Sequence, residues 1–159
     1  MRNIIYRYVL VEQSAIRCTA NTELPTEPGL LRTCREIRHE ASDIYFKEDF
    51  FLVHMENYEA GQLIRWSLKS RRHLRAHLKF RFHGLNAGSW SNLLVWLEAY
   101  NKGEAPGMAL REHRSTHVTA VRMFEIVRKQ TEKNVPWVEI ASILEDIKVA
   151  LGASGVAWI

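Results

Sequence analysis

The sequence predicts an α+β fold, in which a small β-sheet is covered by helices and the C-terminal third of the chain is helical. Three observations lead to this prediction. Residues 77–84 alternate strictly between apolar and polar side chains, which is typical of a strand with one buried face. Strand-like and helix-like segments follow one another through the middle of the chain. Beyond residue 115, apolar residues recur only at helical spacing.

Residues 2–10 have helical spacing, and residues 14–20 alternate like a short strand. The helical spacing gathers four apolar side chains on one side, Ile4, Ile5, Tyr8 and Val9. Residues 21–29 have the composition of a turn. Pro28 suits the first turn of a helix, where its missing N–H costs nothing.

The next helix is expected to run through residues 28–46. Its apolar residues form one stripe that should face the core, namely Leu30, Leu31, Cys34, Ile37, Ala41, Ile44 and Tyr45. Its charged residues fall mainly on the other side, namely Arg32, Arg35, Glu36, His39, Glu40 and Asp43. Arg32 and Glu36 are four positions apart, a spacing at which opposite charges stabilise a helix by about 0.2–0.5 kcal/mol.

The middle of the chain then alternates between strands and helices. Residues 49–55 read as an apolar strand, residues 57–70 as a helix, residues 77–84 as a second strand and residues 89–103 as a helix between a Ser cap and a Gly. The side chains expected inside are Leu63, Ile64 and Leu68, then Leu78, Phe80 and Phe82, then Trp90, Leu93, Leu94, Leu97 and Tyr100. The opposite, solvent-exposed face of the second strand is expected to carry His77, Lys79, Arg81 and His83.

Two further helices complete the chain after a loop over residues 104–115. They are expected over residues 116–131 and 136–151, and Gly152 should end the second. The side chains expected inside are Val118, Val121, Phe124 and Val127, then Trp137, Ile140, Ile143, Leu144 and Ile147. The tail that follows ends in Trp158 and Ile159, and its apolar character predicts that it packs on the core.

Length and composition are those of one globular domain over residues 1–159. Of the 159 residues, 47% are hydrophobic and 25% are charged, which is enough for a substantial core. The formal net charge of +4 permits acidic partners without requiring them. There is no apolar run long enough for a membrane span and no leader-like start. With only two cysteines, we expect an intracellular protein of the cytoplasm or nucleus whose thiols are free and buried.

The segment over residues 29–51 resembles the signature of the large fungal F-box-like family, an Arg–x–Cys–Arg–x–Ile–Arg–x–Glu–Ala core with aromatic residues and a strand after it. The matching residues are Leu31, Arg32, Cys34, Arg35, Ile37, Arg38, Glu40, Ala41, Tyr45, Phe46 and Phe50. Residues 2–10 resemble the second half of the F-box-like helix, and the likeness extends over residues 1–103. Most members of this family have no known activity.

The resemblance implies a protein-interaction module with an unidentified protein partner. In the family a Leu–Pro–x–Glu lead-in precedes the first helix, and this chain opens at Met1 without it. An F-box docks on a Skp-type adaptor through several helices, so such an adaptor is not the expected partner. Arg35, Arg38 and Glu40 are the candidate partner-binding residues. The alternative is that these charges anchor neighbouring elements of the chain itself.

The sequence offers no convincing metal or catalytic site. His73 and His77 are four residues apart, as are His113 and His117, but neither pair has the intervening Glu of a metalloprotease motif. There is no nucleophile elbow and no Gly-rich phosphate loop. Cys34 lies on an apolar stripe, where a thiol is usually inert. We therefore predict a protein that is not an enzyme and uses no cofactor and no metal.

Nucleic-acid binding is the alternative function. Seven basic residues without an intervening acid form a basic patch, namely Arg65, Lys69, Arg71, Arg72, Arg75, Lys79 and Arg81. Together with Trp66 and His73 they could neutralise phosphates and stack on bases. The same patch would suit an acidic protein. Against this reading, the net charge is modest and no known nucleic-acid motif accompanies the patch.

Overall fold

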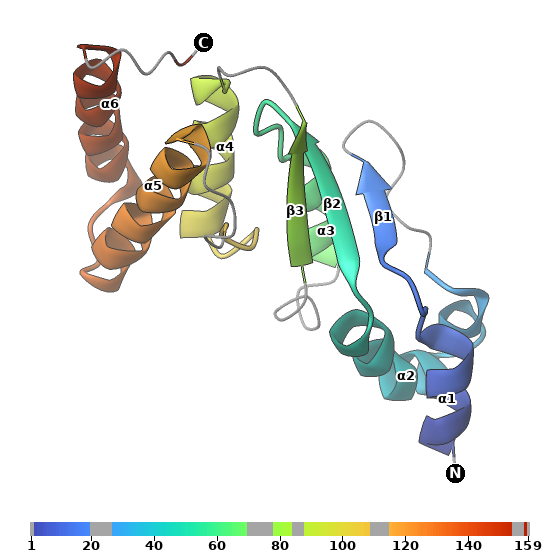
Figure 1. The fold of residues 1–159 in the computed structure, drawn as a ribbon. Coiled ribbons are helices and arrows are strands. Elements are labelled where there is room, and N and C mark those ends of the chain that lie inside the picture. The colour runs from blue at the N-terminus through green and yellow to red at the C-terminus, as the bar shows by residue number, and fades with distance from the viewer. Residues whose placement is uncertain are drawn as a thin grey trace.

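The fold is α+β, as the sequence predicts. The computed structural model describes residues 2–19, 27–69, 78–83, 88–108, 115–153 and 158, and their side chains except those of residues 19, 69, 78–83 and 115–117. Figure 1 shows an elongated, arched molecule with the sheet at its middle and helices at both ends. None of the helices in these ranges is long and apolar enough to cross a lipid bilayer.

All but one of the predicted helices and strands are present, with ends shifted by up to four residues. The elements are α1 (Arg2–Leu10), β1 (Ile16–Thr19), the 3-10 helix η1 (Gly29–Arg32), α2 (Arg35–Glu48), β2 (Phe51–Glu56), α3 (Gly61–Lys69), β3 (Leu78–His83), α4 (Trp90–Asn101), α5 (Ser115–Glu132) and α6 (Trp137–Ala153). One prediction of a continuous helix was wrong: η1 and α2 are separate, and extended Cys34 lies between them as the N-cap of α2. Gly152 lies inside α6 rather than ending it.

The sheet has three parallel strands in the order β1-β2-β3. Parallel neighbours require crossover connections, and η1 with α2 and then α3 lie in the two connections. The register sets Leu78, Phe80 and Phe82 beside Phe51, Val53 and Met55 of β2, all three of which are buried. The predicted alternation in β3 therefore matches the buried alternation of its neighbour.

Aromatic rings fill the space between the sheet and its helices. Phe51 of β2 lies edge-on to Tyr45 of α2, with 5.4 Å between centroids, and to Trp66 of α3, at 5.0 Å. Phe46 of α2 is stacked against Phe51 at 6.3 Å. These contacts place α2 and α3 against the same face of the sheet, and in Figure 1 α3 lies behind it.

Around α4, the C-terminal helices contribute further buried side chains to the core. Trp96 is fully buried, donates its Nε1–H to the carbonyl of Pro106 at 2.9 Å, and lies edge-on to Phe124 of α5 at 4.8 Å. Ile140 and Leu144 bury the inner face of α6. Ser89 caps α4 by accepting the N–H of Asn92, as predicted.

Four burial predictions were wrong. Cys34 is exposed, because its extended conformation removes it from the helical stripe, and only Cys18 is a buried thiol. Leu68 is 41% exposed, since α3 turns Trp66 and Ser67 inward instead. Val118 and Ile143 lie at the exposed margins of their helices. The prediction that the tail packs is confirmed at Trp158, whose ring centroid lies 5.5 Å from that of Trp90.

Candidate functional site

Ion pairs join helix α1 to helix α2. Arg7 donates three hydrogen bonds to Glu48 of α2, from Nε to Oε2 at 2.8 Å and to Oε1 at 3.0 Å, and from Nη2 to Oε1 at 2.9 Å. Arg2 reaches Glu36 at 3.0 Å and Glu40 at 3.2 Å. These polar contacts at both ends of α1 fix which side of the helix faces α2.

The buried contact between α1 and α2 is small. Tyr6 and Leu10 are the buried residues of α1, and the Tyr6 hydroxyl donates to Oε2 of Glu40 at 2.9 Å. This bond to a carboxylate raises the pKa of Tyr6. The hydrogen bond from Arg7 lowers the pKa of Glu48, so the pair is favoured in its charged form. The anchor of α1 therefore combines two buried side chains with ion pairs at the surface.

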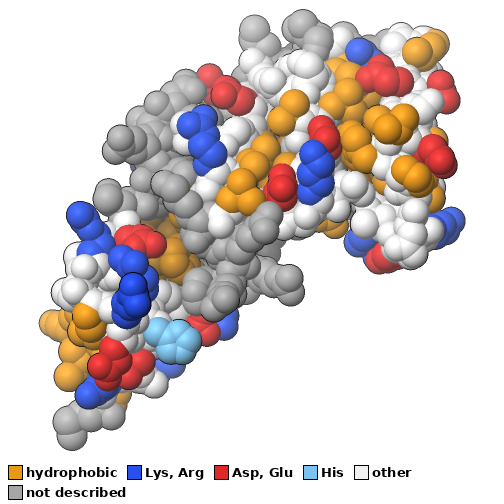
Figure 2. Space-filling model, turned by 180° about the vertical axis from the view of Figure 1, so that it is seen from behind, with side chains coloured by type: hydrophobic (Ala, Val, Ile, Leu, Met, Phe, Trp, Pro, Cys, Tyr) orange, Lys and Arg blue, Asp and Glu red, His pale blue; other side chains and the backbone are white. Residues whose placement is uncertain are grey.

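The opposite side of α1 is apolar and faces solvent. The exposed fractions are 70% for Ile4, 56% for Ile5, 91% for Tyr8 and 56% for Val9. We call these four residues the α1 face. Figure 2 shows hydrophobic side chains at the margin of this end of the molecule, next to charged ones. The sequence predicted that the four residues share one side; the structure turns that side away from the core.

The predicted partner-binding residues of α2 are only partly available to a partner. Arg38 donates its Nε–H to the carbonyl of Leu31 at 2.8 Å and lies 3.6 Å from Glu27, so it links α2 to η1 and to the segment before it. Glu40 holds Arg2 and Tyr6. Arg35 is exposed at the first turn of α2. Two of the three residues therefore make contacts within the chain.

The charge pairing on α2 also differs from the prediction. Glu36 lies 3.0 Å from Arg2 of α1, whereas the sequence suggested an Arg32–Glu36 pair. The reason is that Arg32 belongs to η1, outside the helix that carries Glu36, so the helical spacing does not apply to the two residues.

The basic patch lies largely outside the described residues. Arg71, Arg72 and Arg75 fall between α3 and β3, and Lys69 is described only in its backbone. Arg65 is exposed on α3, where its Nε lies 3.4 Å from the carbonyl of Gly61. Lys79 and Arg81 occupy positions of β3 that pair with Leu52 and His54 of β2. His73, His77 and His113 are also outside the described residues, and His117 is described only in its backbone.

Two observations concern thiols and metal ligands in the described ranges. Burial raises the pKa of the Cys18 thiol to about 12, which leaves it protonated and unreactive near neutral pH. Within residues 2–19, 27–69, 88–108 and 118–153, no three His, Cys, Asp or Glu side chains gather as metal ligands would. Cys34 is exposed at the start of α2.

One buried carboxylate was not predicted from the sequence. Asp49 follows α2 and is 1% exposed. Its Oδ1 accepts the N–H of Glu12 at 2.7 Å, and its Oδ2 has no hydrogen-bond partner among the residues that the structure describes. Burial raises the pKa of Asp49, and the nearby Glu12 and Glu48 raise it further. Its role in the fold is to hold the connection between α1 and β1.

Comparison with known proteins adds no assignment: no family model, no curated protein and no solved structure matches this chain.

Proposed function

We propose that this protein is a non-enzymatic, intracellular protein-interaction module related to the fungal F-box-like proteins, and that the α1 face is its docking surface. The observation that carries the proposal is the orientation of α1. Ion pairs at both ends of the helix hold its polar side against α2 and leave four large apolar side chains in solvent. Contiguous apolar exposure of this kind marks interaction sites.

The shape of the α1 face suggests the kind of partner. Nine helical residues span about 13 Å, and Ile4, Ile5, Tyr8 and Val9 are adjacent on the helix surface. A short helix with one apolar side fits the helix-in-groove mode, in which the partner supplies an apolar groove. The arginines that flank the face are already paired with glutamates, so we expect apolar contacts rather than ion pairs to provide most of the affinity.

The experiment compares charge insertions on two exposed apolar sites. The variant Ile5→Glu/Tyr8→Glu alters the α1 face, whereas Val149→Glu alters an exposed position of α6 and serves as the control. Each tagged protein is used to capture partners from the native organism, and the captured protein is then purified and titrated calorimetrically. We expect affinity to fall at least tenfold for the α1 variant alone.

Equal affinities of the wild type and the α1 variant for the purified partner would contradict the proposal. Capture of a Skp-type adaptor would show that this protein can bind such an adaptor with fewer helices than an F-box uses. Turnover of a metabolite by the purified protein would contradict the non-enzymatic part of the proposal.

The second candidate function is nucleic-acid binding through the basic patch, and one observation favours it. The register sets Arg17, Leu52 and Lys79 side by side across the sheet, and Thr19, His54 and Arg81 likewise. Leu52 and His54 alternate with the buried residues of β2, so these positions belong to the face opposite α2 and α3. Basic residues from two parts of the sequence thus share one sheet face.

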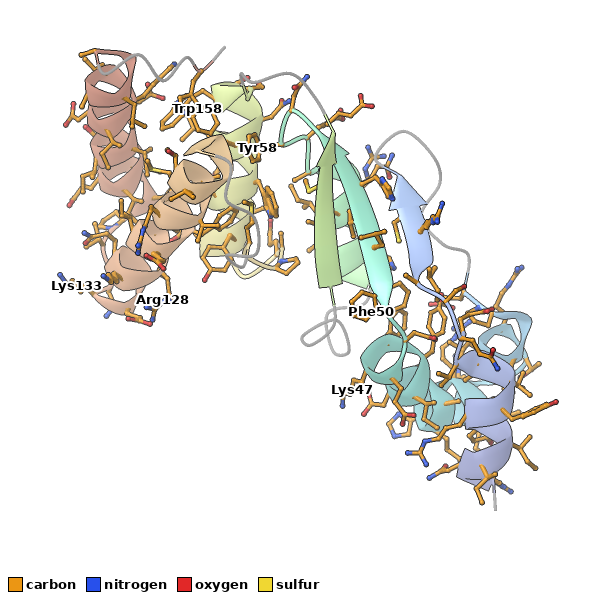
Figure 3. The ribbon with its side chains drawn as sticks, in the orientation of Figure 1. Lys47, Phe50, Tyr58, Arg128, Lys133 and Trp158 are labelled. Atoms are coloured by element: carbon orange, nitrogen blue, oxygen red, sulfur yellow. The ribbon has the colours of Figure 1, made fainter. Side chains whose placement is uncertain are left out.

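This candidate is tested by the salt dependence of binding. The variant Lys79→Glu/Arg81→Glu reverses two charges of the patch. The control Arg128→Glu/Lys133→Glu makes the same net change on and just after α5, away from the sheet (Figure 3). If the patch binds nucleic acid, only the first variant will weaken binding of a labelled single strand, and log affinity will fall linearly with log salt. Absence of binding at low salt would exclude this function.

A further inference from the structure

Three segments that are distant in the sequence meet around Trp158. Its ring centroid lies 5.5 Å from that of Tyr58, in the turn after β2, and 5.5 Å from that of Trp90, at the start of α4. Its backbone forms a parallel β-bridge with Gly88. We call Tyr58, Gly88 and Trp90 the aromatic notch. Figure 3 shows Trp158 and Tyr58 next to each other beside α4.

The aromatic notch is built from constrained residues. Asn57 and Tyr58 have φ of 48° and 62°, in the left-handed region that non-glycine residues seldom adopt, and the amide of Asn92 donates to the Asn57 carbonyl at 3.1 Å. Any residue other than glycine at position 88 would place a Cβ atom in overlap with the Tyr58 ring and 2.9 Å from Cζ3 of Trp158. Only a position without a side chain lets two rings approach the backbone in this way.

The second wall of the aromatic notch is fixed from α6. Trp90 donates its Nε1–H to Oε1 of Glu145 at 2.6 Å, and the ammonium group of Lys148 lies 5.6 Å from the centre of the Trp90 ring. Tyr58 and Trp90 are almost completely buried, whereas Trp158 is only partly buried. The two wall residues are thus anchored within the fold, and Trp158 lies against them as the outer component.

Trp158 is held in two ways that an external peptide could reproduce. Its backbone pairs with Gly88 as one strand residue pairs with another, and its side chain contacts two rings. Strand pairing supplies affinity that is independent of sequence, and a side-chain pocket supplies specificity. The combination selects an extended segment with a large aromatic residue at one position.

We propose that the aromatic notch is a binding site for an extended peptide segment that carries a tryptophan, and that Trp158 occupies it in cis. This inference does not depend on the α1 face. Because Trp158 is tethered, its effective concentration at the notch is on the order of millimolar, and an external peptide must compete with it. Only molecules in which Trp158 has left the notch can bind the peptide. The apparent affinity is therefore the intrinsic affinity multiplied by the fraction of such molecules.

The test uses the full chain and a fluorescein-labelled peptide with the sequence of residues 154–159. Binding is followed by fluorescence anisotropy for the wild type and for Trp158→Ala, which leaves the notch unfilled. We expect the variant to bind the peptide at least tenfold more tightly than the wild type. We expect no binding of a peptide in which alanine replaces the tryptophan, and none to the double variant Gly88→Val/Trp158→Ala. Circular dichroism establishes that both variants are folded.

A second measurement covers the case in which Trp158→Ala does not fold. Hydroxyl-radical labelling of the wild type, read by mass spectrometry, reports the exposure of each tryptophan, with fully buried Trp96 as the internal reference. Saturating unlabelled peptide should increase labelling of Trp158 severalfold and leave Trp96 unchanged. Unchanged labelling of Trp158 at millimolar peptide, or equal binding of the peptide by wild type and folded Trp158→Ala, would overturn the proposal.

Discussion

At the scale of single residues, Asp49 and Cys34 behave differently from what their positions in the sequence indicate, whereas Cys18 is a buried free thiol as predicted. Asp49 is a carboxylate in an almost fully buried site, yet nothing in its local sequence distinguishes it from the exposed acids around it. Cys34 was expected to be buried because it continues an apolar stripe. The stripe is interrupted at Cys34, since the backbone there is extended with φ of −151°, and spacing alone does not reveal such a break.

The buried carboxyl predicts a pH-dependent stability. Since burial raises the pKa of Asp49 in the folded protein, its contribution to stability is present below the unfolded-state pKa and is lost as pH rises through the folded-state pKa. We expect the difference in free energy of unfolding between Asp49→Asn and wild type to shift in favour of the variant from pH 4 to pH 7. Urea denaturation of both proteins measures this difference. A difference that does not vary with pH would show that Asp49 is not desolvated.

The cysteines predict a thiol count that depends on folding. Cys34 is exposed, whereas Cys18 is buried and burial raises its pKa to about 12. We expect Ellman's reagent to label one thiol rapidly in the native protein and two in guanidinium. The variant Cys34→Ser should show no rapid labelling, and rapid labelling of two native thiols would mean that β1 is accessible.

At the scale of elements, α1 shows what periodicity can and cannot predict. The spacing correctly identified the helix and the residues that share its apolar side. It did not predict where that side points, because orientation depends on Glu36, Glu40 and Glu48, which lie far along the chain. The same limit applies to Arg38 and Glu40, whose chain partners could not be identified before α1 and η1 were placed.

The contribution of the polar contacts between α1 and α2 can be tested by amide hydrogen exchange. The variant Glu40→Ala/Glu48→Ala removes carboxylates that Arg2, Tyr6 and Arg7 contact. Exposed ion pairs contribute about 0.2–1 kcal/mol each, and a hydrogen bond to a charged group contributes about 1.5–3 kcal/mol. We expect exchange in α1 to accelerate at least tenfold while α5 is unaffected. Glu98→Ala, which removes the partner of Lys102 within α4, is the control and should leave α1 unchanged.

At the scale of the whole molecule, the sheet and the C-terminal helices meet at the aromatic notch. The α+β class and the order of elements could be predicted, since each depends on local spacing. The contacts between Trp158 and Tyr58 could not, because they join positions one hundred residues apart through ring packing that leaves no local pattern. The only sequence signal was the apolar character of the tail.

A double-mutant cycle measures how strongly Trp158 is coupled to the middle of the chain. Aromatic pairs at this separation contribute about 0.5–1.5 kcal/mol beyond their burial. We expect a coupling free energy in that range between Tyr58→Leu and Trp158→Leu, from denaturant unfolding. The matched pair is Tyr58→Leu and Phe124→Leu. The Phe124 ring packs against Trp96 and Tyr100, so these two changes should be additive within about 0.5 kcal/mol. Additivity in the first pair would mean that the notch does not join the two parts.

The parallel order of the strands also bears on how the chain reaches this structure. Among the three described strands, no two are joined by a hairpin, and residues 20–50 must be bridged before β1 can pair with β2. Closing so long a segment costs entropy before any ladder bond forms, whereas α5 and α6 are close in sequence. The C-terminal helices should thus assemble early, while Phe51 and Val53 still face water in an unpaired strand. Refolding at high protein concentration would then lose material to aggregation during that interval.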